Sequence, residues 1–305
     1  MEQDVSLRGR IIRQVIAGIS SDFALGDKLK SGELRKNLTE LPWHCPDGFS
    51  MQKEKLRHCD AYLLQPDHPG NTQIILQLHG GGYIAALRNA YFQWAVQYSK
   101  IAGLCRVLTL DYRIAPEHPY PAALEDATDA YQWLLQNGYA AKDIVVVGDS
   151  AGGGLAMALC MKLREKKIPL PFGLISMSPW TDLTLSGESY SSNFTRDPLF
   201  GNSKNSMVFN RDYIGNNNPK NPYISPLFGD FHDFPPMLIQ VGDLEMLLCD
   251  SLGVAQKAKE QGVSVHCTVY EGMFHVFQMA GRLLPESHRA WEEIEEYLSY
   301  LGFGR

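Results

Sequence analysis

Short apolar runs alternate with amphipathic stretches along most of the chain. The apolar runs are rich in β-branched residues, which suits strands that are buried on both faces. Strands are expected at 56–64, 74–78, 107–112, 144–147, 172–178, 236–241 and 263–270. Apolar positions at helical spacing predict helices over 91–101, 122–136, 155–163, 247–261 and 285–301. Strands that alternate with helices in this order predict an α/β fold with a mostly parallel central sheet flanked by helices.

Two segments interrupt this alternation. Residues 1–45 carry one or two amphipathic helical patterns, with Ile12, Val15 and Ile16 at helical spacing and a second short helix expected over 27–38. Residues 181–226 are polar and turn-rich with interleaved aromatic side chains, which favours a helical excursion over sheet. We therefore expect a helical cap of 1–45 and 181–226 on an α/β core of 46–180 and 227–305.

Composition adds limits to this picture. The chain has 305 residues, 45% of them hydrophobic and 20% charged, and its net charge is −6 with both signs interspersed. These values are typical of a globular protein and do not indicate a nucleic-acid partner. The N-terminus lacks a signal-peptide pattern, and no run of 18 apolar residues predicts a membrane span. We expect a cytoplasmic protein without a membrane partner.

The six cysteines are scattered and form no C-x-x-C pair. Reduced, buried thiols explain this distribution more simply than a disulfide framework. No group of cysteine and histidine residues has the spacing of a zinc site. The sequence therefore predicts neither a metal nor a cofactor.

A glycine-rich turn follows the apolar run 144–147. Gly148-Asp-Ser150-Ala-Gly152 matches G-x-S-x-G, the pattern of a nucleophile elbow between a strand and a helix, although an ordinary glycine turn has the same pattern. About 70 residues upstream, His79-Gly-Gly-Gly82 ends another predicted strand, where exposed backbone N–H groups can stabilise an oxyanion. The two motifs together are far more specific than either one alone.

A nucleophilic serine needs a base and an acid, which follow it in the chain order serine, acid, histidine. Among the histidines after Ser150, His275 fits best because it lies in a loop after a strand, where open α/β sheets bind ligands. The remaining three, 232, 266 and 288, are expected in a surface turn, a strand and a helix. Asp243, Glu245 and Asp250 all qualify as the acid by position, and spacing leaves this choice open.

Several motifs appear in order along the chain: His79-Gly-Gly-Gly-Tyr83, Asp111-Tyr-Arg-Ile-Ala-Pro-Glu117, Gly148-Asp-Ser-Ala-Gly-Gly153, Ser178-Pro-Trp180, Asn221-Pro-Tyr-Ile-Ser-Pro226 and Gly272-Met-Phe-His275. Together they resemble the bacterial hormone-sensitive-lipase family of α/β-hydrolases. The resemblance implies the α/β-hydrolase fold with a helical cap, no cofactor and a homodimer through the sheet edge.

The resemblance also implies roles for individual residues. Glu245-Met-Leu-Leu-Cys-Asp250 aligns with the family's acid motif, which makes Glu245 the acid and leaves Asp243 as its rival. The oxyanion donors become the N–H groups of Gly81, Gly82 and Ala151, and Tyr83 is expected to line the substrate pocket.

These observations predict a serine carboxylesterase in which Ser150, His275 and Glu245 hydrolyse short- to medium-chain acyl esters. Two alternatives stay open. Plant gibberellin receptors resemble this family but lack a working triad, whereas this chain has a serine, a histidine and a candidate acid. Amidase or peptidase action would use the same residues, and the motifs do not distinguish it from ester hydrolysis.

Overall fold

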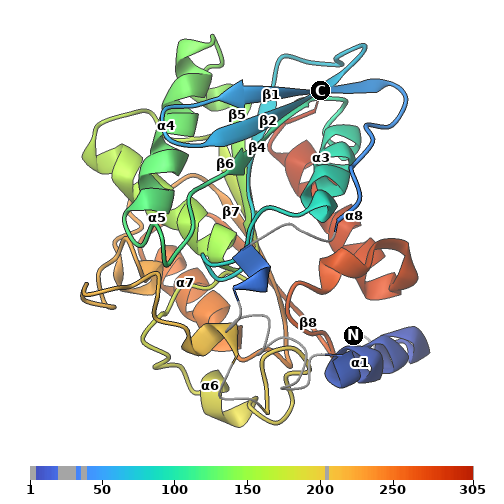
Figure 1. Cartoon of the computed structure of the whole chain (residues 1–305), viewed down its shortest axis with the longest axis vertical. Helices are drawn as coiled ribbons and strands as arrows, with labels where there is room; N and C mark the ends of the chain where they lie inside the picture. Colours follow the sequence, from blue (N-terminus) through green and yellow to red (C-terminus); the bar gives the residue numbers. More distant parts are fainter. Residues whose placement is uncertain (1–4, 20–31, 36–39, 203–205, 305) are drawn as a thin grey trace.

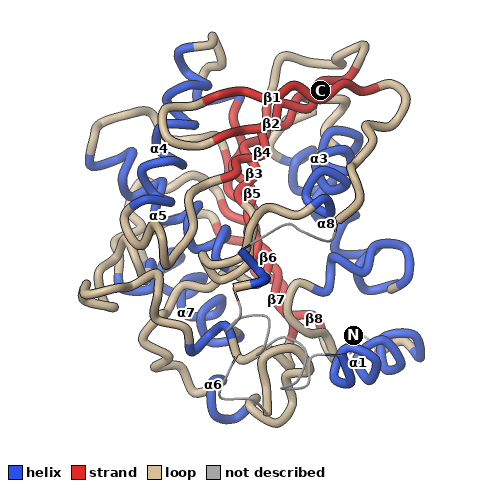
Figure 2. The backbone as a smooth tube through the Cα atoms, viewed as in Figure 1, coloured by secondary structure: helices blue, strands red, loops and turns tan. Residues whose placement is uncertain are grey.

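An eight-stranded sheet crosses the centre of the molecule in the order β1-β2-β4-β3-β5-β6-β7-β8 (Figure 2). The computed structural model describes residues 5–19, 32–35, 40–202 and 206–304. The strands are β1 (Phe49–Lys55), β2 (Asp60–Pro66), β3 (Ile74–Leu78), β4 (Arg106–Asp111), β5 (Ile144–Asp149), β6 (Gly173–Met177), β7 (Met237–Gly242) and β8 (Val265–Tyr270).

From β4 to β8 neighbouring strands pair in parallel, whereas β1 and β2 pair antiparallel at one edge. The expected mostly parallel sheet is confirmed. Strand β1 was not predicted, because most of its side chains are exposed or half-buried and no buried apolar run marks it. Its place in the sheet comes from the backbone ladder with β2, in which Phe49 faces Pro66.

Helices cover both faces of the sheet (Figure 1). They are α1 (Leu7–Ile19), α3 (Asn89–Ile101), α4 (Ala122–Gln136), α5 (Ala151–Glu165), α6 (Ser189–Ser192), α7 (Leu248–Glu260) and α8 (Pro285–Tyr300). Helices α4, α5 and α7 bury their apolar sides in one large cluster with the sheet, and α3 and α8 form a second cluster on the opposite face. This layering buries the parallel strands on both sides, as their apolar sequences require.

The two segments expected to form a cap contain little regular structure. Besides α1, the first has the 3₁₀ turn η1 (Glu33–Arg35), and most of the helix expected over 27–38 lies outside the described residues. Between β6 and β7 the described chain has α6, the 3₁₀ turns η3 (Met207–Phe209) and η4 (Pro226–Phe228), and otherwise turns and bends. Its aromatic side chains Tyr190, Phe200 and Tyr213 are buried, and thus the segment packs through its rings rather than through long helices.

Strands β5, β6, β7 and β8 are parallel neighbours, so their carboxyl ends meet at one edge of the sheet. Ser150 follows β5, Ser178 follows β6, Glu245 follows β7 and His275 follows β8. In α/β sheets this edge is where ligands bind. The fold therefore brings together residues that are up to 125 positions apart in the sequence. In the described part of the chain, no helix is long and apolar enough to cross a membrane.

Candidate active site

Ser150 occupies a sharp turn between β5 and α5. Its backbone has φ 52° and ψ −122°, a conformation that L-residues rarely adopt and that is typical of strained functional positions. Its N–H donates to the Met177 carbonyl at 2.9 Å. The turn also requires a residue without a side chain at Gly152, because a Cβ atom there would lie 2.1 Å from the Leu78 carbonyl oxygen. The expected elbow geometry is therefore present at Ser150.

His275 and Glu245 form a buried pair beside this turn. The Nδ1 atom of His275 lies 2.9 Å from Oε2 of Glu245, and both side chains are buried. Because a carboxylate can only accept, the Nδ1–H group donates, and Nε2 of the neutral ring is left as a proton acceptor. The ring of Phe200 packs against His275 with 4.5 Å between centroids. This arrangement fixes one tautomer and one orientation of the imidazole.

Ser178 holds the Glu245 carboxylate from the other side. Its hydroxyl donates to Oε1 of Glu245 at 2.7 Å, and the N–H of Gly242 donates to the same oxygen at 2.5 Å. The hydroxyl of Ser178 also accepts from the N–H of Val276 at 3.1 Å. Sequence reasoning noted Ser178 only as part of a motif, although its position at the end of a buried strand was a usable signal. The hydroxyl links the acid to the backbone directly after His275.

The two rival acids have other partners. One carboxylate oxygen of Asp243 accepts from the N–H of Gly272 at 2.6 Å, and the other lies 3.3 Å from Arg196 in an ion pair. Asp250 accepts from the backbone N–H groups of Thr181 and Asp182 at 2.8 and 2.7 Å. Burial raises the pKa of Asp250 well above its ordinary value. Of the three candidate acids, Glu245 is therefore the one that the structure brings to His275.

The glycine loop after β3 is tied to the serine turn. The N–H of Gly80 donates to Tyr91 Oη at 2.8 Å and to Oδ1 of Asp149 at 3.0 Å, and the Tyr91 hydroxyl donates to Oδ2 of Asp149 at 3.0 Å. Desolvation by burial raises the pKa of Asp149 to about 7. Asp149 therefore connects the glycine loop to the serine turn, and Tyr91 is a partner that the sequence gave no reason to select.

The next two glycines of this loop face the serine. Gly81 and Gly82 adopt φ 106° and 63°, and both line the cavity that contains Ser150. Within the described chain, neither N–H group donates a hydrogen bond to another protein group. Ala151 begins α5, where backbone N–H groups lack partners inside the helix. The three N–H groups are thus free to donate to a ligand, as an oxyanion site requires.

His79, at the start of the loop, braces it. The ring is buried and stacks on Tyr112 with centroids 4.1 Å apart and planes 5° from parallel. Its Nδ1 atom lies 2.7 Å from the Gly80 carbonyl, to which it donates when neutral. Desolvation by burial lowers the pKa of His79 to about 4. The ring is therefore neutral near pH 7 and serves packing rather than proton transfer.

The cavity above Ser150 has a volume of about 340 Å³, at the lower end of ordinary ligand sites. Gly81, Gly82, Ser150 and His275 form its floor, and Trp180, Leu199, Phe200, Val208 and Leu247 supply most of its apolar wall. Leu199, Phe200 and Val208 come from the segment between β6 and β7. The site can therefore hold a small, largely apolar molecule with its reacting group against the serine.

Tyr83 lies elsewhere, contrary to the expectation that it lines this pocket. Its side chain is buried and stacks on Tyr213 with centroids 3.7 Å apart and planes 6° from parallel. It is not among the described residues that line the cavity of Ser150. The sequence-based assignment is wrong because the ring lies in the hydrophobic core, stacked on Tyr213.

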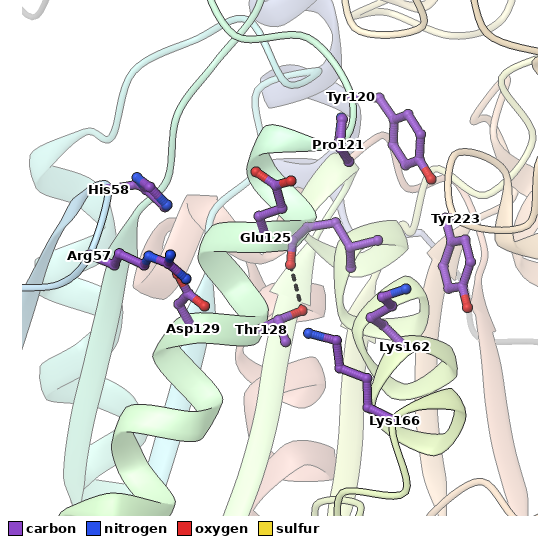
Figure 3. A pocket seen from close by; sticks show the side chains of 11 residues that line it. Arg57, His58, Tyr120, Pro121, Glu125, Thr128, Asp129, Lys162, Lys166 and Tyr223 are labelled. Carbon is purple, nitrogen blue, oxygen red and sulfur yellow. Dashed lines mark hydrogen bonds between the residues drawn. The ribbon is translucent and has the colours of Figure 1, made fainter.

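A second cavity, of about 450 Å³, lies between α4 and α5 (Figure 3). Glu125, Thr128 and Asp129 face it from α4, Lys162 faces it from α5, and Lys166 faces it from the position directly after α5. It contains none of the candidate catalytic residues, and its lining carries charges of both signs without a nucleophile and base in contact. Among the residues that the structure describes, there is also no group of three metal-ligating side chains.

Residues 75–279 match the model of a family described as having the alpha/beta hydrolase fold. The chain is 38% identical over 230 residues to an esterase of Acinetobacter venetianus, and the alignment covers 75% of this chain and 76% of that protein. It is 33% identical over 287 residues to an acetyl-hydrolase of Streptomyces hygroscopicus, covering 87% and 95% of the two chains. A crystal structure of an esterase from the bacterial hormone-sensitive lipase family superposes with a TM-score of 0.81 at 34% identity, over 98% of each chain.

Proposed function

Because the chain belongs to the α/β-hydrolase family, in its bacterial hormone-sensitive-lipase branch, we propose that Ser150, His275 and Glu245 make it a serine carboxylesterase. The relatives named above are an esterase and an acetyl-hydrolase, which supports a carboxylic ester as the substrate. The observation that carries the proposal is the buried His275–Glu245 hydrogen bond of 2.9 Å at the cavity of Ser150.

In this mechanism the hydroxyl of Ser150 attacks the ester carbonyl carbon while Nε2 of His275 takes the hydroxyl proton. Glu245 stabilises the imidazolium that forms. The tetrahedral oxyanion accepts hydrogen bonds from the N–H groups of Gly81, Gly82 and Ala151. When the carbon–oxygen bond to the leaving group breaks, His275 returns the proton to it and an alcohol departs.

The acyl-enzyme is then hydrolysed by the same groups, with water in the place of the serine hydroxyl. His275 takes a proton from a water molecule, whose oxygen attacks the acyl carbon, and the same N–H groups hold the second oxyanion. Breakage of the bond to Ser150 releases the carboxylic acid, and the serine oxygen recovers its proton from His275. No metal or cofactor enters any step.

Short- to medium-chain acyl groups suit the cavity best. Its volume of about 340 Å³ and its mainly apolar wall favour a compact hydrocarbon chain over a bulky or charged one. Leu199, Phe200 and Val208 belong to 181–226, which supports the division into a cap of 1–45 and 181–226 and a core of the remaining residues. We also propose that the protein is a cytoplasmic homodimer. Sedimentation analysis can measure its mass in solution.

Substitution of the serine tests the proposal directly. Ser150→Ala should lower kcat/KM for p-nitrophenyl butyrate by about 10⁴-fold or more, because it removes the nucleophile. The wild type should lose activity with one organophosphate bound per chain, and Ser150→Ala should not react. Unlabelled wild-type protein would support a receptor of the same fold instead. Turnover of an anilide at a rate comparable with that of the matched ester would support an amidase.

A further inference from the structure

Exposed apolar side chains gather on two elements near one end of the molecule. The described residues include ten large hydrophobic side chains that are exposed, and five of them lie on α1 and on η5 (Phe277–Leu283). Leu7, Ile11 and Val15 of α1 are 73%, 51% and 54% exposed, and Met279 and Leu283 of η5 are 48% and 71% exposed. Single exposed hydrophobic residues need no explanation, but a group of them marks an interaction site.

The two elements pack on one apolar cluster. Phe274, Phe277 and Leu284 form its centre together with neighbouring residues, and Ile12 and Ile16 of α1 pack against it. The N-terminus of α1 is fixed as well, because Ser6 donates through its N–H and its hydroxyl to Glu286 at 2.8 and 2.9 Å. Figure 1 shows α1 at the rim of the molecule, beside the segment that joins β8 to α8. The inner faces of α1 and η5 are therefore buried in the same cluster, and their outer apolar side chains remain exposed.

The outer face of α1 has an ordered pattern. Leu7, Ile11 and Val15 recur every four residues, so they form one stripe along the helix. With about 100° between successive residues, Arg8 falls at one margin of the stripe and Arg10 lies toward the other, whereas Arg13 points away from it. An apolar stripe with arginine on both sides is the pattern of a helix that lies in a membrane–water interface.

The charge of this face differs from that of the whole chain. Arg8 and Arg10 of α1 and Arg282 of η5 form no ion pair with a carboxylate in the described structure. The chain as a whole has a net charge of −6. The nearby Glu286 is buried and already accepts two hydrogen bonds from Ser6. A positive, apolar face on an acidic protein is complementary to an anionic lipid surface, whereas two copies of it would repel each other.

Met279 connects this face to the cavity of Ser150. Its side chain lines the cavity and is also exposed at the outer surface of η5. A lipid surface that contacts Met279 would therefore lie beside the cavity of Ser150. An apolar ester held in such a surface would have a short path to the site.

We propose that α1 and η5 form a peripheral docking surface for anionic lipid, with Leu7, Ile11, Val15, Met279 and Leu283 entering the acyl boundary and Arg8, Arg10 and Arg282 contacting the headgroups. The sequence-based expectation of no membrane partner rested on the lack of a spanning segment, and a peripheral contact needs none. The proposal concerns binding and does not depend on the catalytic assignment.

Vesicle co-sedimentation tests it with the Ser150→Ala protein, which leaves the lipid intact. This protein should bind vesicles of phosphatidylcholine mixed with phosphatidylglycerol, should bind pure phosphatidylcholine weakly, and should dissociate as salt rises. Arg8→Gln/Arg10→Gln should weaken binding about 25-fold, since each basic side chain near an anionic surface contributes a factor of about five. Ile11→Gln/Val15→Gln should weaken it about tenfold or more.

A matched control changes the same residue types elsewhere. Leu252→Gln/Arg57→Gln alters an exposed leucine of α7 and an exposed arginine of the turn after β1, and its binding should equal that of the parent. The proposal is wrong if the parent protein does not bind the anionic vesicles, or if the control weakens binding as much as the α1 variants. It is also wrong if Ile11→Gln/Val15→Gln abolishes a dimer in sedimentation analysis without lipid and leaves vesicle binding unchanged, because the face would then contact a second copy.

Discussion

Replacement of Ser178 by alanine removes one of the two side-chain donors that the described structure gives to the Glu245 carboxylate, the other being His275. The backbone should not change, because Ser178 has φ 49° and alanine experiences the same strain as serine in that conformation. The substitution removes the 2.7 Å hydrogen bond to Oε1 of Glu245 and the acceptor of the Val276 N–H group. It therefore loosens the acid and the histidine loop together, without touching Ser150 or the cavity wall.

The size of the effect follows from the type of hydrogen bond. A hydrogen bond to a buried ionised group contributes about 1.5–3 kcal/mol, and each 1.4 kcal/mol changes a rate about tenfold. Glu245 keeps the N–H of Gly242 and the ring of His275 as donors, so the substitution should loosen the Glu245 carboxylate without removing its contact with His275. We expect kcat and kcat/KM of Ser178→Ala to fall about 10- to 100-fold with KM almost unchanged. Such a change indicates an interaction made chiefly in the transition state.

Ser176→Ala is the matched control for this variant. Ser176 lies two residues earlier on β6, is equally buried, and its hydroxyl has no hydrogen-bond partner within the described structure. Initial rates with p-nitrophenyl butyrate over a range of concentrations give kcat and KM for both variants, and thermal unfolding monitors their stability. The reasoning is refuted if Ser178→Ala retains wild-type kcat, if Ser176→Ala loses as much, or if only KM changes.

Three further predictions follow from the site. Glu245→Gln should lower kcat about 10⁴-fold and Asp243→Asn less than tenfold, since only Glu245 contacts His275; steady-state kinetics with the reverse order would make Asp243 the acid. Burial raises the pKa of Asp149 from 3.8 to about 7, so between these pH values the carboxyl is ionised in the unfolded chain but protonated in the folded one. The unfolding free energy of the wild type should therefore fall, relative to that of Asp149→Asn, as pH rises from about 4 to 7. Denaturant titrations at both ends of this range check it, and a pH-independent difference would contradict it. Phe200→Ala should shift the preferred p-nitrophenyl ester to a longer acyl chain, because the ring fills the cavity beside His275; an unchanged chain-length profile would place the acyl group elsewhere.

Much of this architecture could be predicted from the sequence because local patterns determine it. The apolar run before Ser150 predicted a buried strand, which forms as β5, and helix α4 has the bounds that its periodicity predicts. Strand β1 had no such pattern, since its side chains are largely exposed and its pairing partner determines its conformation.

The contacts within the site are harder to predict because they join distant segments. Asp243 and Glu245 both follow β7, so spacing could not separate them, and the distance to His275 depends on how the loop after β8 folds back. Ser178 and Tyr91 hold partners that are 67 and 58 residues away in the chain. Tyr83 was placed in the pocket because it follows the glycine loop, but its stacking on Tyr213 depends on a segment 130 residues later.

The network of Gly80, Tyr91 and Asp149 has a consequence for how specificity can change in this protein. It joins the glycine loop, helix α3 and the serine turn through buried hydrogen bonds made entirely within the core. The donors that face the substrate are therefore preorganised before any ligand arrives, and little ordering entropy is left to lose on binding. The wall residues from 181–226 have no part in that network. Phe200 is an exception because its ring packs against His275, but substitutions of Leu199 and Val208 can reshape the cavity wall while that network stays the same, so the shape of the cavity and the order of the glycine loop can evolve separately.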